Sequence, residues 1–358
     1  MIGGDMHFGE NYARTDTQAS SDGAQQIDDQ ARYYKSVERL KPLVDRSQFA
    51  MVNLETPLSP ALSDGQTGKD YVHWSDVSKS APALGKLGID AVGLGNNHSV
   101  DQGESGLRKT LANLGEHGIA WFGADLNLQR AQAPLLRELP RPGGGKITLA
   151  IFGMLEERPV YRNKYRFYAE RGKPGVASVD VAAFKRHVAE LHAAHPDLFV
   201  VAFPHWGANY AWADNDQVEL GRALIDAGAD IVIGQHAHTI QEIERYHGKW
   251  ILYGIGNFAF LAPGRYAKFR RVQPFGLVAM LSFGSEAATP PNIRLYPFAS
   301  DNRTTGYMTR PATFEEASIV LTSIDQRKKS IGFHGQLIRD DPLGPAIELR
   351  QKTPGKFW

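Results

Sequence analysis

Residues 230–238 read DIVIGQHAH, a short apolar run that ends in two histidines one residue apart. A few β-branched residues between polar neighbours are typical of a buried strand rather than a helix. Along an extended chain, side chains at positions i and i+2 point to the same side. His236 and His238 therefore predict a metal site at the end of this strand, with chance placement among the chain's 12 histidines as the alternative.

The segments before this strand alternate between helical and strand patterns. A helix is expected over residues 215–227, ending before Gly228, and another over residues 181–194 with Asp180 as its N-cap. Strands that alternate with helices predict an α/β fold. The other expected elements of this part are strands at 48–55, 91–96, 147–155 and 198–206 and helices at 75–87 and 104–117.

The pattern changes after His238. Residues 239–246 and 249–258 predict a β-hairpin that turns at His247 and Gly248. We expect a main domain over residues 1–285 and a C-terminal extension, residues 286–358, packed on it. The remaining expectations are strands at 276–283 and 292–298, a helix at 315–329, a polar loop at 10–30 and irregular structure in the last 30 residues.

Polar residues gather where the predicted strands end. In open α/β sheets, the carboxyl ends of the strands form the edge at which ligands bind. Each group alone has a structural alternative, such as a strand-exit turn at residues 53–57 or an Asx-turn at Asn96 and Asn97. Their repetition argues against chance placement. The groups are Asp5 with His7, Asn53 with Glu55, Asn96 to His98 with Asp101, His205, and His236 with His238.

The types of these side chains indicate the kind of site. The chain has no cysteine, which excludes disulfides, thiolate ligands and a cysteine nucleophile. His, Asp, Glu and Asn donors suit divalent ions such as Mn, Fe, Zn, Co or Ca, and the pattern does not choose among them. There are more potential ligands than one tetrahedral zinc site uses, and they suit two ions about 3.5–4 Å apart. We therefore predict one or two divalent metal ions as the cofactor.

Charge and hydropathy limit the partners. A net charge of +1 leaves no basic surplus for nucleic-acid binding. The sequence contains neither an apolar run of about 18 residues nor a signal-peptide pattern, so we expect a cytoplasmic protein without a membrane-spanning segment. Only four residues precede Asp5, which makes the first strand short. Whether Met1 is the true start, and the oligomeric state, are left open.

The order of these elements resembles the signature of the calcineurin-like metallophosphoesterases. D-x-H at residues 5–7, the acidic strand end, G-N-N-H at 95–98, H-W-G at 205–207 and G-x-H-x-H at 234–238 follow in that order. Within that superfamily the chain resembles the CapA, or poly-γ-glutamate capsule synthesis, branch. The similar stretches are NLETP at 53–57, Asp101 with Gly103, DAGADIVIG at 226–234, Gln241, and YGIGNF at 253–258. The resemblance implies a calcineurin-like four-layer α/β sandwich, in which helices flank two packed mixed sheets.

The resemblance also implies roles for the polar residues. His98 would donate a proton to the leaving group, oriented by Asp101. Glu55 would bridge two ions or lean towards one of them. Because Glu55 is longer than the aspartate usual at this place, a single ion is an alternative. The implied ligands of one ion are Asp5, His7 and His238, and those of the second are Asn97, His205 and His236.

Two further groups are candidate substrate-binding residues. Arg158, Arg162 and Arg166 belong to a basic and aromatic stretch that could clamp an anionic or peptidic substrate. The alternative is a solvated loop. Trp206 and Tyr210 follow His205 and either wall the site or pack in the core.

The resemblance, together with these observations, implies three candidate functions. The first is a CapA-type metal-dependent hydrolase of a phosphoester, or of an amide in a peptidic or poly-γ-glutamate-like substrate, by metal-activated water. The second is a metal-dependent peptide epimerase of a ribosomal-peptide pathway, in which Asp5 and one of His98, His236 or His238 exchange the Cα proton. The third is a non-catalytic subunit of capsule-polymer assembly.

Overall fold

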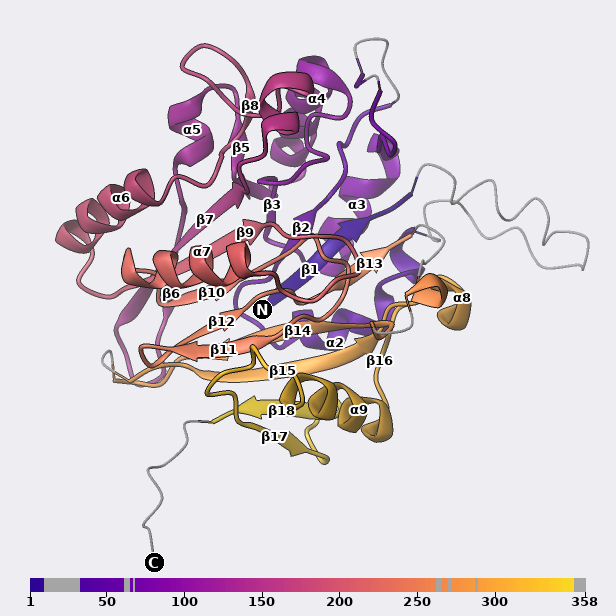
Figure 1. Cartoon of the computed structure of the whole chain (residues 1–358), viewed down its shortest axis with the longest axis vertical. Coiled ribbons are helices and arrows are strands. Elements are labelled where there is room, and N and C mark those ends of the chain that lie inside the picture. The colour runs from indigo at the N-terminus through magenta and orange to yellow at the C-terminus, as the bar shows by residue number, and fades with distance from the viewer. Residues whose placement is uncertain are drawn as a thin grey trace, which may run out of the picture.

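Two β-sheets pack face to face in the computed structural model, and helices cover their outer faces (Figure 1). The structure describes residues 1–9, 33–60, 65–66, 68–261, 266–269, 272–286 and 289–350. The loop expected at residues 10–30 lies outside these ranges. Among the described helices, none reaches the length and hydrophobicity that crossing a bilayer requires.

The first sheet is mixed and, within the described ranges, has ten strands. They are β1 (Ile2–His7), β2 (Met51–Leu54), β3 (Ala91–Gly93), β4 (Ala120–Phe122), β13 (Asn257–Phe260), β14 (Phe275–Ser282), β15 (Asn292–Ala299), β16 (Arg310–Pro311), β17 (Gly335–Ile338) and β18 (Ala346–Leu349). The order is β17-β18-β15-β14-β1-β2-β3-β4, with β13 paired to β1 and β16 to β15. Because β1 to β4 run parallel, their carboxyl ends meet at one edge.

The second sheet has six strands in the order β11-β12-β10-β9-β7-β6. They are β11 (Ile243–Tyr246), β12 (Lys249–Leu252), β10 (Ile231–Ile233), β9 (Leu198–His205), β7 (Lys146–Leu155) and β6 (Leu135–Pro140). The four central strands are parallel, so β9 and β10 end at the same edge. A separate antiparallel pair, β5 (Ala124–Asp125) and β8 (Gly175–Val176), lies outside both sheets.

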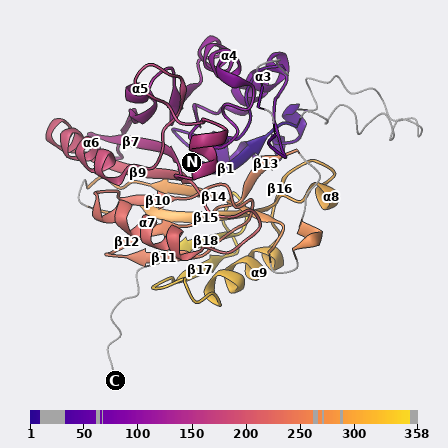
Figure 2. The same ribbon diagram turned by 45° about the horizontal axis from the view of Figure 1, so that its top comes forward.

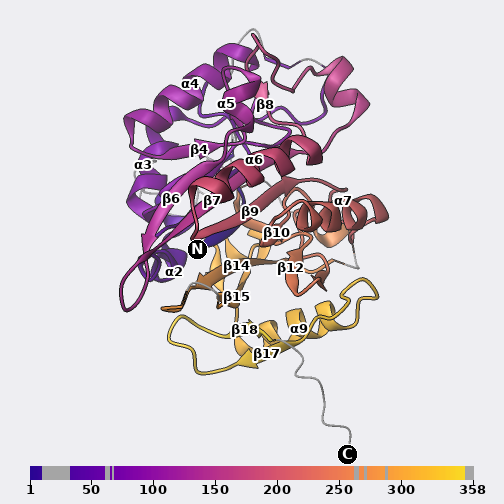
Figure 3. The same cartoon turned by 90° about the vertical axis from the view of Figure 1, so that its left-hand side faces the viewer.

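Three apolar clusters separate the layers. The central one joins the sheets, with Met51 from the first and Val201 from the second. Leu84 and Leu111 pack helices α3 (Val77–Leu87) and α4 (Gly103–Glu116) on the first sheet. α6 (Val181–Ala194) and α7 (Asn215–Asp226) pack on the second, and Figure 3 places α3 and α7 on opposite sides of the sheets. The predicted four-layer α/β sandwich is confirmed.

The remaining helices are short or lie at the margin. They are α2 (Lys41–Asp45), α5 (Leu128–Gln132), α8 (Asn302–Thr305) and α9 (Phe314–Asp325), with single turns at Glu38–Leu40, Val160–Lys164 and Tyr266–Lys268. Figure 2 shows α3 and α4 above β1 and β13, with α9 at the opposite end. α9 packs beside β15, β17 and β18 and contributes Val320 and Ile324 to the central cluster.

Local signals placed several element ends correctly. Asp180 caps α6 by accepting a hydrogen bond from the Ala183 amide at 2.9 Å. Gly88 ends α3 in the left-handed region, with φ of 96°. The β11–β12 hairpin turns at His247 and Gly248, both with positive φ, as the sequence predicted.

Three expectations were wrong. Asp5 does not end the first strand, because β1 continues to His7 after a register shift beyond Asp5. Residues 249–258 do not form one strand, because β12 ends at Leu252 and β13 crosses to pair with β1 in the other sheet. The last 30 residues are not wholly irregular, because β17 and β18 extend the first sheet beside β15. The domain division at residue 285 falls between the paired strands β14 and β15 and stays a prediction.

Candidate metal centre

Strand ends from both sheets bring the predicted ligands into one buried cluster. Each of these side chains is less than 9% exposed, and Asp5, His7 and Glu55 are fully buried. Contacts from Glu55 to His205 join the first sheet to the second. The contributors are Asp5 and His7 in β1, Glu55 after β2, Asn97 and His98 after β3, His205 at the end of β9, and His236 and His238 after β10.

Glu55 lies at the centre of the cluster. Its Oε1 is 3.3 Å from His205 Nε2 and 3.9 Å from His98 Nε2, and its Oε2 is 3.9 Å from His238 Nδ1. Neither oxygen accepts a hydrogen bond from any residue that the structure describes. Burial, and then the charge of Asp5, raise the pKa of Glu55 well above its usual range. Burying a carboxylate costs folding free energy unless it is paired or binds a metal, so Glu55 is suited to be a metal ligand.

Two groups of potential ligands share Glu55. In each, one ligand atom per residue lies within 4.8 Å of the others: Glu55, His205 and His236 form the first group, and Asp5, Glu55 and His238 form the second. Asn97 adjoins the first group, with Oδ1 2.7 Å from His205 Nε2. Carboxylate, imidazole and amide donors suit a divalent ion, and a shared carboxylate suits two neighbouring ions.

His205 and His236 are held in the neutral form. Burial lowers the pKa of His205 to about 3, and burial together with His205 lowers the pKa of His236 well below its usual range. His205 Nε2 lies 2.9 Å from His236 Nδ1. Neutral imidazoles have the lone pairs that a metal ion requires.

His236 and His238 converge through the backbone and not through strand alternation. β10 ends at Ile233, and the two histidines have left-handed φ values of 89° and 53°. The two histidines do lie near each other as predicted, but the side-chain alternation of an extended strand is not the reason.

Burial acts to lower the pKa of His238, but Glu55 and Asp5 outweigh it and raise that pKa to about 9.

Asparagines orient the Asp5 end of the cluster. Asn53 Nδ2 donates to Asp5 Oδ1 at 2.7 Å and lies 3.2 Å from His205 Nδ1. Asn257 Oδ1 is 2.8 Å from His238 Nδ1. The structure does not bring His7 into either group: its ring lies beside Phe260, 4.9 Å away between centroids. A metal-binding role for His7 stays a prediction.

His98 stands beside the two groups and is paired with Asp101. The Asp101 carboxylate lies 2.6 Å and the Lys69 ammonium 3.0 Å from His98 Nδ1, and Nε2 faces Glu55. Lys69 pairs with the other oxygen of Asp101 and donates to the Asn97 carbonyl at 2.7 Å. Burial lowers the pKa of Lys69 and raises that of Asp101, and the charge of each residue opposes the shift in the other.

Sequence reasoning missed Lys69 and His73. The backbone amide of His73 donates to Asp101 at 2.6 Å, and its ring lies 3.9 Å from that of His98 and 4.2 Å from that of His7. Both residues lie in a loop without periodicity, far from any predicted strand end. A buried lysine leaves no local signal, and His73 resembles the chain's other histidines.

The three predicted substrate-binding arginines are placed differently. Arg158 adjoins the cluster: it pairs with Glu156 and donates to the Gly207 carbonyl, and its charge adds to burial in lowering the pKa of His205. Arg162 is half exposed and pairs with Glu157 at 2.5 Å. Arg166 is exposed. A substrate role for these residues stays a prediction.

Trp206 and Tyr210 also differ. Trp206 is fully buried under the second sheet, and its indole donates to the Tyr253 carbonyl at 2.7 Å. Its contacts match the packing alternative, since no part of the ring is open to a substrate. The Tyr210 ring lies 5.6 Å from that of His238, so Tyr210 does border the cluster.

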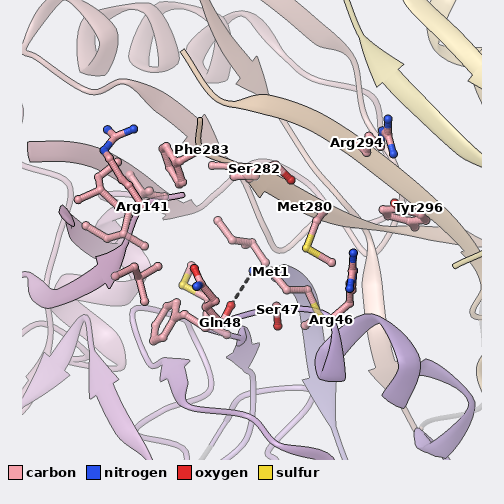
Figure 4. Close-up of a pocket in the computed structure, with 18 of the residues that line it drawn as sticks. Met1, Arg46, Ser47, Gln48, Arg141, Met280, Ser282, Phe283, Arg294 and Tyr296 are labelled. Atoms are coloured by element: carbon pink, nitrogen blue, oxygen red, sulfur yellow. Dashed lines mark hydrogen bonds between the residues drawn. The ribbon is translucent and has the colours of Figure 1, made fainter. Parts of the chain in front are cut away.

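A cavity of about 940 Å³ lies at the opposite, amino-terminal end of β1 (Figure 4). Met1 and Met280 line it, and the Met1 amino group donates to the Phe49 carbonyl at 2.6 Å. None of the candidate metal ligands lines this cavity. Its size therefore says nothing about the chemistry at the carboxyl edge.

Gly234 allows the loop that carries His236 to approach the core. A Cβ there would lie 2.0 Å from Tyr253 O and 2.3 Å from Trp206 Nε1. We expect Gly234→Ala to lower the free energy of unfolding by about 3 kcal/mol, because neither atom can move without breaking a hydrogen bond. Urea unfolding checks this. In Gly85→Ala, the exposed helical control, a Cβ meets nothing within 4 Å, and the expected gain is about 0.5–1 kcal/mol. Equal effects of the two variants would contradict the expectation.

Several known proteins with similar sequences are named for the synthesis of capsules or of glutamate and glutamine polymers. A family model described as bacterial capsule synthesis protein PGA_cap matches residues 1–262. The PGA biosynthesis protein CapA of Bacillus subtilis is 30% identical over 222 residues, which are 62% of this chain and 55% of that protein. A probable polyglutamine synthesis accessory protein of Mycobacterium tuberculosis is 33% identical over 223 residues, or 59% and 55%. The capsule biosynthesis protein CapA of Bacillus anthracis is 25% identical over 226 residues, or 62% and 52%. The chain spans about half the length of these relatives.

Proposed function

The chain belongs to the bacterial capsule synthesis protein family PGA_cap, and from this we propose that it is a metal-dependent hydrolase. Its substrate would be a phosphoester, or an amide in a peptidic or poly-γ-glutamate-like chain. The relatives named for PGA and polyglutamine synthesis support the polymeric substrate over the phosphoester. The observation that carries the proposal is Glu55, a buried carboxylate without a described hydrogen-bond donor that two groups of potential ligands share.

The residues of this chain have distinct parts in the proposed reaction. Divalent ions bound by Glu55 and the two groups would lower the pKa of water and stabilise negative charge on the substrate. Asn53 and Asn257 fix Asp5 and His238. Asp101 holds His98 with Nε2 towards Glu55, where it can exchange a proton with a leaving group.

Asp5→Ala and His238→Ala are the direct tests. We expect each variant to bind less metal than the wild type and to lose more than about 100-fold in hydrolysis, because loss of even an outer partner of a metal ligand costs about 10–100-fold. Protein stripped with EDTA and reloaded with Mn²⁺ would be assayed by elemental analysis and with p-nitrophenyl phosphate.

His192→Ala is the matched control, because His192 is an exposed histidine on α6. It is expected to keep full metal content and activity. Wild-type protein that takes up no divalent ion, or Asp5→Ala and His238→Ala that retain all of theirs, would remove the basis of the proposal.

One observation supports a second candidate, a peptide epimerase. His98 and His238 approach different oxygens of Glu55, so proton-transfer groups flank the centre on two sides. An epimerase would exchange a peptide Cα–H for deuterium in D₂O and leave p-nitrophenyl phosphate intact. A non-catalytic assembly subunit would bind metal and do neither.

A further inference from the structure

Tyr266 lies in the single turn Tyr266–Lys268, beside the loop that carries His238. Its side chain is buried, and its hydroxyl donates to the His238 carbonyl at 2.7 Å. Because a carbonyl can only accept a hydrogen bond, the single proton of the hydroxyl is used in this contact. Tyr266 is therefore tied to the backbone of one of the candidate metal ligands.

This contact acts on a strained part of the backbone. His238 has a φ of 53°, in the left-handed region that a residue with a side chain adopts only where its surroundings hold it. The Tyr266 hydroxyl supplies such a restraint at the carbonyl. The Tyr266 ring also packs edge-on against that of Tyr210, 5.4 Å away between centroids, and the Tyr210 amide donates to the Ala237 carbonyl at 2.8 Å. Tyr266 thus supports the loop from outside it.

Tyr266 also supports the imidazole of His238, through Asn257. Asn257 Nδ2 donates to the Tyr266 hydroxyl oxygen at 3.2 Å, and Oδ1 of the same amide lies 2.8 Å from His238 Nδ1. Ser300 Oγ is 3.2 Å from the Tyr266 oxygen and donates to it, because the proton of Tyr266 is already used. All four side chains are at most 6% exposed, so water does not compete for these contacts.

We propose that Tyr266 is a positioning residue of the metal centre. With one hydroxyl it fixes the backbone of His238 and, through Asn257, the imidazole that approaches the other ligands of its group. This inference rests on the proposed function, in which His238 is a metal ligand. Tyr266 and Ser300 lie beyond residues 1–262, so a part of the chain outside the family match completes the centre.

Tyr266→Phe tests this inference, because it removes only the hydroxyl. We expect the Kd for Mn²⁺ to rise about 10–100-fold in at least one binding step, as found when the partner that orients a metal ligand is lost. Isothermal titration of EDTA-stripped protein with Mn²⁺ alone measures this without catalysis. The visible absorption spectrum of the Co²⁺-loaded variant should also differ from that of the wild type, because the ligand geometry changes.

Tyr253→Phe is the matched control. Tyr253 is fully buried, and its hydroxyl donates to Glu244 Oε2 at 2.5 Å in the apolar cluster under α7. Each variant loses one buried hydrogen bond, so both should lower Tm. Only Tyr266→Phe should weaken Mn²⁺ binding, whereas Tyr253→Phe should keep the wild-type Kd and Co²⁺ spectrum.

The proposal for Tyr266 is overturned if Tyr266→Phe binds Mn²⁺ as tightly as Tyr253→Phe. If Tyr266→Phe shows no cooperative thermal transition, Ser300→Ala is judged by the same comparison, with a smaller rise in Kd expected. Wild type that binds no divalent ion would overturn this inference together with the hydrolase proposal. Metal binding that depends on Tyr266 without any hydrolysis would support the positioning role while the hydrolase proposal fails.

Discussion

Glu55→Gln is expected to make the metal-free protein more stable and to abolish its stabilisation by metal. The wild-type carboxylate is fully buried near Asp5, and no described residue donates a hydrogen bond to it. Replacing it with a neutral amide removes a buried charge, which should raise the free energy of unfolding in EDTA by about 1–3 kcal/mol. Wild type should gain about 2.7 kcal/mol at a metal concentration 100 times Kd, whereas the variant should gain little.

The difference between the two proteins should depend on pH. Because the folded pKa of Glu55 is raised, its stabilising contribution is full below the unfolded value of 4.5 and is lost as pH rises towards the folded pKa. Metal-free wild type should therefore lose stability relative to Glu55→Gln above about pH 4.5, by at most about 1.4 kcal/mol per pH unit. Urea titrations in EDTA at several pH values measure this.

Glu242→Gln provides a matched buried control. Glu242 is 3% exposed, but its Oε2 accepts a hydrogen bond from the Ala213 amide at 2.9 Å. Its replacement should not stabilise the metal-free protein and should leave the response to metal intact. A metal response preserved in Glu55→Gln would show that Glu55 is not a ligand.

Lys69→Met is expected to be the most destabilising of the proposed substitutions. Lys69 is 8% exposed and Asp101 is fully buried, so loss of the ammonium leaves a buried carboxylate without its cation. Breaking such a pair costs about 3–5 kcal/mol. Hydrolysis should also fall by about 10–100-fold, because Asp101 would no longer hold His98 firmly. Urea unfolding and the p-nitrophenyl phosphate assay measure the two effects.

Two further variants make this expectation specific. The double variant Lys69→Met with Asp101→Asn removes both charges and should recover much of the lost stability, without recovering activity. Lys41→Met breaks the exposed pair with Asp45, whose side chains are 34% and 59% exposed, and should cost less than about 1 kcal/mol. If Lys69→Met costs no more than Lys41→Met, the buried pair does not carry the stability assigned to it.

Much of the metal centre could be predicted because its ligands follow strands of strong local character. Short β-branched runs such as residues 231–233 form strands wherever they find a partner, and parallel strands place their carboxyl ends at one edge. The positions of Glu55, His205 and His238 near strand ends therefore predicted that they lie together, whereas Asp5 joins them from inside β1. Capping residues such as Asp180 act within one helical turn, so the start of α6 was equally readable, whereas the helix expected at residues 315–329 ends at Asp325.

The amino-acid sequence by itself determined the order of the strands and helices and the polar residue at each strand end, because these depend on neighbours within a few positions. Only the tertiary structure decided which distant side chains form ion pairs and which distant strands pair with each other. Lys69 pairs with Asp101 from a loop that has no hydrophobic periodicity. β13, which was expected to continue the hairpin strand, pairs with β1 in the other sheet. β17 and β18 extend the first sheet because β18 pairs with β15. The packing of the second sheet likewise places Trp206 in the apolar core and not beside the metal centre. Such contacts are decided by burial and by pairing across the chain, and these energies do not exist until the two sheets have come together.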